Sequence, residues 1–482
     1  NFNYKGGYIV LFRMTKDVWL KIDLLELLDN HTGALYFHEI LVAFPQISLS
    51  TLQKKCHELQ QEIKNCYLQE EVQLIIDRRN GIELIRETTT LQKIIERLIT
   101  KELPYQISQK FIYEDLFNTE DLCHELGISL SQLRRKITGI NRFINEYDLH
   151  ITVSHQMKLF GSEKRRRSLL VSMLSLAHRQ FSTINWIENS TFYLKQAAKI
   201  IDYLKLPSSY HYLETIAIIS FVNEQAIKRS RKIIFQNDEN VLLQAIRFPK
   251  KPYFLLQREK NDWVFLILTI YSMPFTTISL GIEESFKRSF RKNAIFLDWK
   301  ILFQTYFSPL QTEQEDMLYQ ELLREYITIR LLKVNYIFSS TYTLSILKTL
   351  EISYQHYFQI FSDFWQDYAK LHPFFNLLHA QVNALLICEN FVAWNHYLPQ
   401  VTLFVDTHLM PTLEKWIASK IASSLSGKYH ITFTQNQENA DFIITTYHDT
   451  HFFKKEKIIL VEPTFSANDL TIIEKRLDAF YQ

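Results

Sequence analysis

Glycine and proline are scarce in this chain of 482 residues, which contains only 9 Gly and 11 Pro. Tight turns and flexible linkers depend on these residues, so their scarcity argues against a turn-rich barrel or sandwich and against long linkers. Hydrophobic residues make up 47% of the chain and charged residues 22%, which is the balance of a core-forming protein. Because one domain typically has on the order of 100 residues, we expect several mainly helical domains.

Cysteines and long apolar runs are also few. Cys56, Cys66, Cys123 and Cys388 show no metal-ligand spacing, so we expect free thiols of a reducing cytoplasm rather than disulfides or a zinc site. The apolar run Val264–Ile270 is among the longest, whereas a membrane span needs about 20 residues. The sequence therefore predicts a cytoplasmic protein that does not enter a membrane and needs no metal or other cofactor.

Neither sign of charge dominates, because 54 Lys and Arg residues face 52 Asp and Glu residues. A DNA-binding protein can still be basic only where it touches the duplex. The first third of the chain is nearly balanced too. Any affinity for nucleic acid must therefore come from local clusters.

The clearest motif is a helix-turn-helix pattern between Asn118 and Asn145. Gly127 permits the positive φ that ends a first helix, and Ser129 can cap the next one. Apolar residues at spacings of three and four predict the buried face of that second helix: Leu130, Leu133, Ile137, Ile140 and Ile144.

The opposite face carries side chains suited to phosphates and base edges in a major groove. With the capping Ser129, the candidate DNA contacts on this face are Ser131, Gln132, Arg134, Arg135, Lys136 and Arg142, and Asn141 is assigned to the same face. An ordinary two-helix corner with a solvated charged face is the alternative explanation.

A weaker copy of this motif lies upstream. Its predicted buried face is Leu49, Leu52, Cys56 and Leu59, and its candidate DNA contacts are Ser50, Thr51, Gln53, Lys54 and Lys55. Two predicted strands follow, Val72–Ile76 and Ile82–Ile85, and the Asn80-Gly81 pair between them favours a hairpin. Such a hairpin is typical of a winged helix, in which Arg78 and Arg79 at the tip can contact DNA. A solvated tip is the alternative.

These patterns predict a mainly α, multidomain fold. The expected order is an N-terminal segment with a first winged helix-turn-helix unit at 1–88, a second unit at 89–163, helical-bundle modules at 164–281 and 282–397, and a small α/β domain at 398–482 with a largely parallel sheet. A basic run, Lys164–Arg167, opens the first helical module. It suggests phosphate contacts, a solvated helix start or an interdomain contact.

In this order of domains the chain resembles the Mga and AtxA family of global virulence regulators. The most informative matches are TEDLCHELGISLSQLRRKI, FPQISLSTLQKKCHEL and LFGSEKRRRSLL. The resemblance implies a transcriptional regulator without enzymatic activity. It also implies binding of double-stranded promoter DNA, often curved or deformable, through both N-terminal units, and self-association as a homodimer.

The helical modules then resemble the regulation domains of the sugar phosphotransferase system. In those domains histidines receive phosphate from the phosphocarrier protein, which is chemically reasonable because neutral imidazole is a nucleophile. The candidates are His178 and His211 in the first module and His356, His372 and His379 in the second. Position favours His211 and His379, and a structural or surface role is the alternative for each.

The C-terminal domain resembles the IIB components of sugar permeases. The loop Val405–Pro411 lacks the phosphate-carrying cysteine of those enzymes, which excludes a phosphocysteine mechanism. We therefore expect this domain to serve dimer contacts or sensing.

Other functions stay open. An RNA-binding antiterminator with the same modules would need a small β-rich RNA-binding domain instead of tandem recognition helices. A non-catalytic sensor or scaffold of the phosphotransferase system also fits, as does a helical scaffold with incidental helix corners. An enzyme is disfavoured, because the chain has no glycine-rich phosphate loop, no metal-spaced His and Cys set and no nucleophile elbow.

Overall fold

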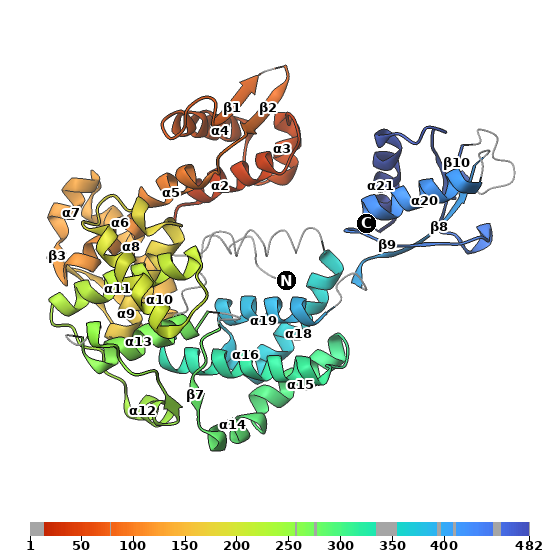
Figure 1. Ribbon diagram of the computed structural model, residues 1–482. Helices are drawn as coiled ribbons and strands as arrows, with labels where there is room; N and C mark the ends of the chain where they lie inside the picture. Colours follow the sequence, from red (N-terminus) through yellow and green to blue (C-terminus); the bar gives the residue numbers. More distant parts are fainter. Residues whose placement is uncertain are drawn as a thin grey trace. The chain divides into compact units, whose positions relative to one another are not determined.

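The protein forms two compact units, one made of Asn1–Lys292 with Tyr319–Leu344 and the other of Asn293–Leu318 with Ser345–Gln482. The computed structural model describes residues 14–77, 79–255, 258–273, 277–333, 354–392, 397–407, 411–446 and 455–481. Helices dominate both units (Figure 1), which confirms the predicted mainly α, multidomain fold. Among the described residues, no helix is long and apolar enough to cross a membrane.

The first unit opens with a winged helix. In chain order it contains α2 (Lys16–Asp29), α3 (Phe37–Ala43), α4 (Leu49–Lys64), β1 (Val72–Asp77) and β2 (Gly81–Arg86). The two strands form an antiparallel hairpin, and Leu35 pairs with Ile82 on the other edge of β2. The hairpin lies where the Asn-Gly pair predicted it.

A second winged helix follows. Its elements are α5 (Gln92–Thr100), α6 (Leu103–Tyr113), β3 (Leu116–Asn118), α7 (Thr119–Leu126), α8 (Leu130–Ile144), β4 (His150–Val153) and β5 (Gln156–Phe160). Strand β5 lies between β3 and β4 and is antiparallel to both. Helix α8 forms because Leu133, Ile137 and Ile144 share one face, and all three are buried.

Helices make up most of the rest of the first unit. They are α9 (Glu163–Ala177), α10 (Ser190–Leu204), α11 (Tyr210–Lys228), α12 (Asn237–Gln244), α13 (Lys260–Tyr271) and α14 (Glu284–Arg291), with part of α16 (Thr312–Leu331). The short strands β6 (Ile246–Arg247) and β7 (Gly281–Ile282) pair antiparallel. The rings of Tyr193 and Phe221, from α10 and α11, lie 5.3 Å apart between centroids and pack edge to face in the core.

The second unit contains helices followed by a small α/β region. The helices α15 (Ala294–Tyr306), α18 (Gln355–Leu371) and α19 (Leu378–Phe391) come first. The α/β region contains β8 (Gln400–Asp406), α20 (Pro411–Leu425), β9 (His430–Phe433), β10 (Phe442–Thr445), β11 (Ile458–Leu460) and α21 (Ala467–Tyr481). The strand order is β11-β10-β8-β9 and every pairing is parallel, as the alternation of short strands and helices predicted.

The core of the α/β region lies between the sheet and its helices. Val401 and Leu403 of β8 pack with Ile417 and Ile421 of α20 and with Ile473 of α21. Residues 408–410 of the loop that we compared with the IIB phosphate loop lie outside the described residues. Before them, the backbone N–H of Thr407 donates to Glu414 over 2.9 Å.

Gly81 lies where the first wing approaches the backbone of Leu35 closely. Its φ is +95°, and an added Cβ would lie 2.6 Å from the carbonyl oxygen of Leu35. Gly33 has a similar φ of +88° with open space around it. We expect Gly33→Ala to destabilise the fold by about 1 kcal/mol through backbone strain alone. Gly81→Ala should destabilise it by at least about 2 kcal/mol, because the backbone of Leu35 must also move.

Thermal unfolding of the full chain measures both variants, with amide hydrogen exchange in β1 and β2 to locate the effect. Equal destabilisation of the two variants would show that the close approach of Leu35 contributes nothing.

Candidate nucleic-acid interface

The first turn of α8 is held by a reciprocal cap. Ser129 Oγ accepts a hydrogen bond from the backbone N–H of Gln132 over 3.3 Å, and Gln132 Oε1 accepts one from the backbone N–H of Ser129 over 2.9 Å. Gly127, at φ +59°, ends α7. This is the turn that the sequence predicts. It also places the side chains of Ser129 and Gln132, both candidate DNA contacts, in the cap.

The cations of α8 are exposed. Buried Leu133, Ile137 and Ile140 hold the helix against the core, and the opposite side is open to solvent. Apart from Ser129 and Gln132 in the cap, the candidate DNA contacts of this motif are all exposed there: Ser131, Arg134, Arg135, Lys136 and Arg142. Within the described ranges, no hydrogen bond or ion pair engages the side chains of these four cations. Cations without internal partners are free to neutralise phosphates.

Asn141 was predicted on the exposed face, and this is wrong. Its side chain is buried; Nδ2 donates to the carbonyl of Ile151 over 2.7 Å, and Oδ1 accepts from the N–H of Ile151 over 2.8 Å. Both groups of one β4 residue are thereby satisfied. The amide joins α8 to the wing and fixes their relative orientation.

Leu49 and Leu130 were predicted to be buried, and this is also wrong. Leu49 is 46% exposed and Leu130 is 37% exposed. Each is the first residue of its helix, directly after a serine cap. Side chains of a helix lean toward its N-terminus, so a residue at this position extends past the helix end instead of into the core.

Helix α4 offers fewer free cations than its sequence suggests. Lys55 forms ion pairs with Asp17 of α2 and with Glu58, the latter at 2.8 Å, and Lys21 binds the same two carboxylates. Burial opposes ionisation of Asp17 and Glu58, but the hydrogen bonds from both lysines outweigh it and lower the pKa of each carboxyl. Lys55 therefore joins α4 to α2.

The other candidate DNA contacts of the first winged helix lie on α4 and on the wing. Ser50, Gln53 and Lys54 are exposed, and Thr51 is half-buried. At the hairpin tip Arg79 is exposed, while Arg78 lies outside the described residues. The N–H groups of Arg79 and Asn80 both donate to Asp77 Oδ1 over 2.7 Å, so the side-chain carboxylate of Asp77 holds these two backbone groups.

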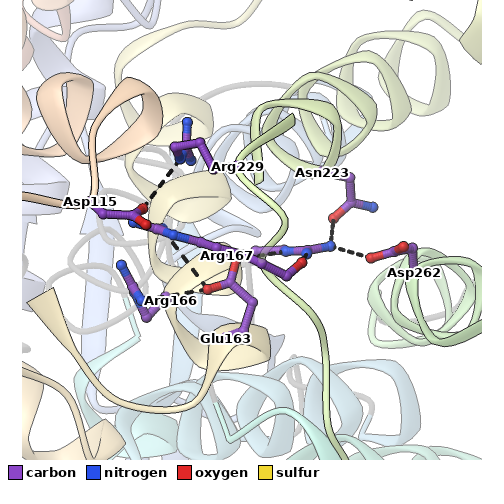
Figure 2. A network of polar contacts seen from close by, with 8 residues as sticks. Asp115, Glu163, Arg166, Arg167, Asn223, Arg229 and Asp262 are labelled. Carbon is purple, nitrogen blue, oxygen red and sulfur yellow. Dashed lines mark hydrogen bonds and ion pairs between the residues drawn. The ribbon is translucent and has the colours of Figure 1, made fainter. Parts of the chain in front are cut away.

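The basic run at the start of α9 is a contact between structural elements. Arg167 is only 1% exposed, and its guanidinium donates to Glu163 over 2.9 Å, to Asn223 of α11 over 3.1 Å and to Asp262 of α13 over 2.6 Å (Figure 2). Arg167 thus joins helices within one compact unit, so it does not have the role of a solvated helix start. In the same run, Lys164 is buried and pairs with Glu239 of α12.

The charged cluster around Arg167 extends to β3, the strand that precedes α7. Asp115 lies directly before β3, and its Oδ1 is 3.3 Å from Nε of Arg229 (Figure 2). Arg231 pairs with Asp115 as well. Burial lowers the pKa of Arg231 to about 10, which keeps its charge at neutral pH. The second winged helix is therefore bound to the end of α11 through charged groups.

Comparison with known families identifies this region. The model of the Mga helix-turn-helix domain matches residues 87–174. The chain carries an Mga helix-turn-helix domain. The match covers α5 to β5 and most of α9, and it makes the chain a DNA-binding transcriptional regulator. No curated protein matches the chain.

The Mga domain contains α8 with all its exposed cations, and also Asp115 and Arg167 of the charged cluster. The first winged helix precedes the matched residues. The predicted resemblance is thus confirmed at the motif on which it chiefly rested.

His178, just beyond the Mga domain, does not suit a phosphate acceptor. It is buried, its Nδ1 lies 2.7 Å from Glu96 Oε1, and its Nε2 lies 2.6 Å from the hydroxyl of Tyr105. Both ring nitrogens are therefore engaged. The ring instead joins the end of α9 to α5 and α6.

The remaining candidate histidines have different surroundings. His356 is exposed near the start of α18. His372 ends α18, and its Nε2 lies 3.0 Å from Asp298 of α15. His211 and His379 belong to α11 and α19, but their side chains lie outside the described part of the structure.

Lys54 and Lys55 are neighbours with different surroundings, so they form a matched pair of variants. We expect Lys55→Ala to lower the unfolding temperature, because it leaves Asp17 and Glu58 with one lysine partner fewer. Lys54→Ala should leave stability within about 0.5 kcal/mol, as expected for an exposed side chain, and should weaken binding to duplex DNA.

Thermal unfolding and fluorescence anisotropy with a labelled duplex give the two measurements. The assignment fails if Lys54→Ala destabilises the protein as much as Lys55→Ala does.

Proposed function

We propose that this protein regulates transcription by binding promoter duplexes through both N-terminal winged helices, with α8 supplying most of the affinity. The observation that carries the proposal is the set of exposed cations on α8, which have no internal partner among the described residues and lie within the matched Mga domain. We propose a binding role without catalysis.

The two winged helices should contribute unequally to the affinity for DNA, because they differ in the number of unpaired cations. Each phosphate neutralised by a cation releases condensed counterions, and this release drives most of non-specific DNA binding. Helix α8 presents Arg134, Arg135, Lys136 and Arg142, whereas Lys55 of α4 is already paired with Asp17 and Glu58. The second winged helix should therefore dominate the affinity, and curved or deformable promoter DNA would lower the energy of engaging both winged helices.

Tandem recognition helices favour duplex DNA over RNA as the ligand. An antiterminator of the kind considered above would have a small β-rich RNA-binding domain before its modules. Here, the described residues between 14 and 160 form two winged helices. We retain RNA binding as the outcome that would replace the proposal.

We further propose that phosphate transfer to a histidine of the second compact unit, Asn293–Leu318 with Ser345–Gln482, regulates DNA binding. A carboxylate that accepts the Nε2 proton fixes the tautomer and leaves Nδ1 as the nucleophile. His372 has this arrangement with Asp298 at 3.0 Å. Phosphorylation would add about two negative charges beside that carboxylate, and the resulting repulsion would loosen the contact between α18 and α15. A homodimer formed through the helical modules would respond to such a change.

The salt dependence of binding tests the DNA interface. We expect Arg134→Ala with Arg135→Ala to weaken duplex binding more than tenfold at low salt. The slope of log K against log salt should become shallower by about 0.9 for each phosphate that the variant no longer neutralises. The fold should survive, since both side chains are exposed.

The matched control is Lys195→Ala with Lys199→Ala, two exposed lysines four residues apart on α10. Gel shifts over a salt series compare the two double variants with the unmodified chain. Equally weakened binding in both would mean that binding has no preference for α8, and binding of single-stranded RNA without duplex would overturn the proposal.

Labelling by the phosphocarrier protein tests the regulatory part. With phosphocarrier charged with radioactive phosphate, we expect acid-labile label on the chain and its disappearance in His372→Ala. His178→Asn should keep the label, because both nitrogens of His178 are engaged in the structure.

His211→Ala and His379→Ala test the positions that the sequence favours. A chain that takes up no label would leave the helical modules without this mode of regulation, and label that persists in His372→Ala would exclude that histidine.

A further inference from the structure

The two recognition helices begin with the same first turn. Both open with the sequence Ile-Ser-Leu-Ser, in which the first serine is the cap. The cap ψ is 156° in both, and the cap hydroxyl lies 3.0 Å from the hydroxyl of the second serine in both. Leu49 and Leu130 therefore occupy equivalent positions.

These leucines are not needed to anchor their helices. The buried contact of each first turn is the next leucine along the helix, and Leu52 and Leu133 are both fully buried. Leu49 and Leu130 are 46% and 37% exposed, and the residues next to them on the open face are polar. An apolar side chain repeated at the same exposed position of two helices suggests contact with an apolar group of the ligand.

We propose that Leu49 and Leu130 each contact the 5-methyl group of a thymine in the major groove, so that the two winged helices recognise the same base feature. The inference rests on the proposed DNA-binding function. Recognition helices present their N-terminal residues to base edges. Among those edges the thymine methyl is the apolar group, and apolar side chains are its usual partners.

The site thus combines two kinds of contact. Ser50 and Ser131 follow the two leucines in sequence, and their hydroxyls lie 3.0 Å from those of the cap serines. These hydroxyls can also bond to a base edge or phosphate. The leucine adds selectivity for thymine over cytosine and over uracil. Arg134 and Arg135 lie one turn further along α8 and are suited to the backbone.

Replacing thymine by deoxyuridine tests the proposal, because it removes the methyl group alone. The probe is a duplex that the full chain enriches from a randomised pool, with each thymine replaced in turn. We expect one replacement in each half of the site to weaken binding about fourfold, which is the effect of one buried methyl group. Leu130→Ala should weaken binding to the thymine duplex by a similar factor and should no longer respond to one of the two replacements. Leu49→Ala should no longer respond to the other.

Leu68→Ala is the matched control, since Leu68 is 67% exposed and lies outside both recognition helices. This variant should respond to both replacements as the unmodified chain does. A chain that binds its duplex with no response to deoxyuridine overturns the thymine contact and leaves the proposed function standing. A response that persists in both leucine variants shows that deoxyuridine acts through DNA shape, which also overturns it. Failure to bind any duplex removes the proposed function itself.

Discussion

A guanidinium group withdrawn from water must be held by several acceptors, because removing one partner of a buried ion pair destabilises a fold by about 3–5 kcal/mol. Arg167 meets this requirement through Glu163, Asn223 and Asp262, which belong to α9, α11 and α13. The last helix of the Mga domain is therefore fixed to two helices of the following module. Any rearrangement of α11 or α13 must either carry Arg167 with it or leave a charge unpaired. The DNA-binding part and the helical module consequently share one core.

The distribution of the cations explains how a chain of net charge +2 can bind a polyanion. Several cations form ion pairs within the protein. They are Lys21 and Lys55 between α2 and α4, and Arg167 and Arg231 around α9 and α11. Their positive charge is cancelled by nearby carboxylates and adds little to the external field. The cations of α8 have no such partners among the described residues. The local field at the recognition helix can thus be strongly positive while the whole molecule is nearly neutral.

Sequence patterns predicted the elements better than the contacts of individual side chains. Helix α20 runs over Pro411–Leu425 as predicted, because its apolar spacing and the initial proline leave few alternatives. Periodicity failed at Asn141, whose burial depends on the backbone of β4, and at Leu130, where a helix end replaces the core. Lys55 has the sequence of an exposed cation, but its partner Asp17 lies on another helix. Such partners are set by tertiary packing, which one sequence does not display. The boundaries at residues 88, 163, 281 and 397 and the DNA contacts themselves stay predictions.

Helices α4 and α8 begin with the same first turn but differ in their number of unpaired cations. The contacts that join the two winged helices determine the consequence of this difference. Glu62 of α4 accepts hydrogen bonds from Arg97 and Lys101 at the end of α5, at 2.7 and 2.5 Å. Burial of Glu62 is outweighed by these two bonds, so the pKa of its carboxyl is lowered and the pairs persist at neutral pH. A first winged helix with few unpaired cations would bind duplex DNA weakly alone. Under the proposed function, the first winged helix would be held beside a bound Mga domain and would meet the duplex at a high effective concentration. Its contribution would then depend more on the base contacts proposed for α4 than on charge, whereas α8 would supply both phosphate contacts and a base contact.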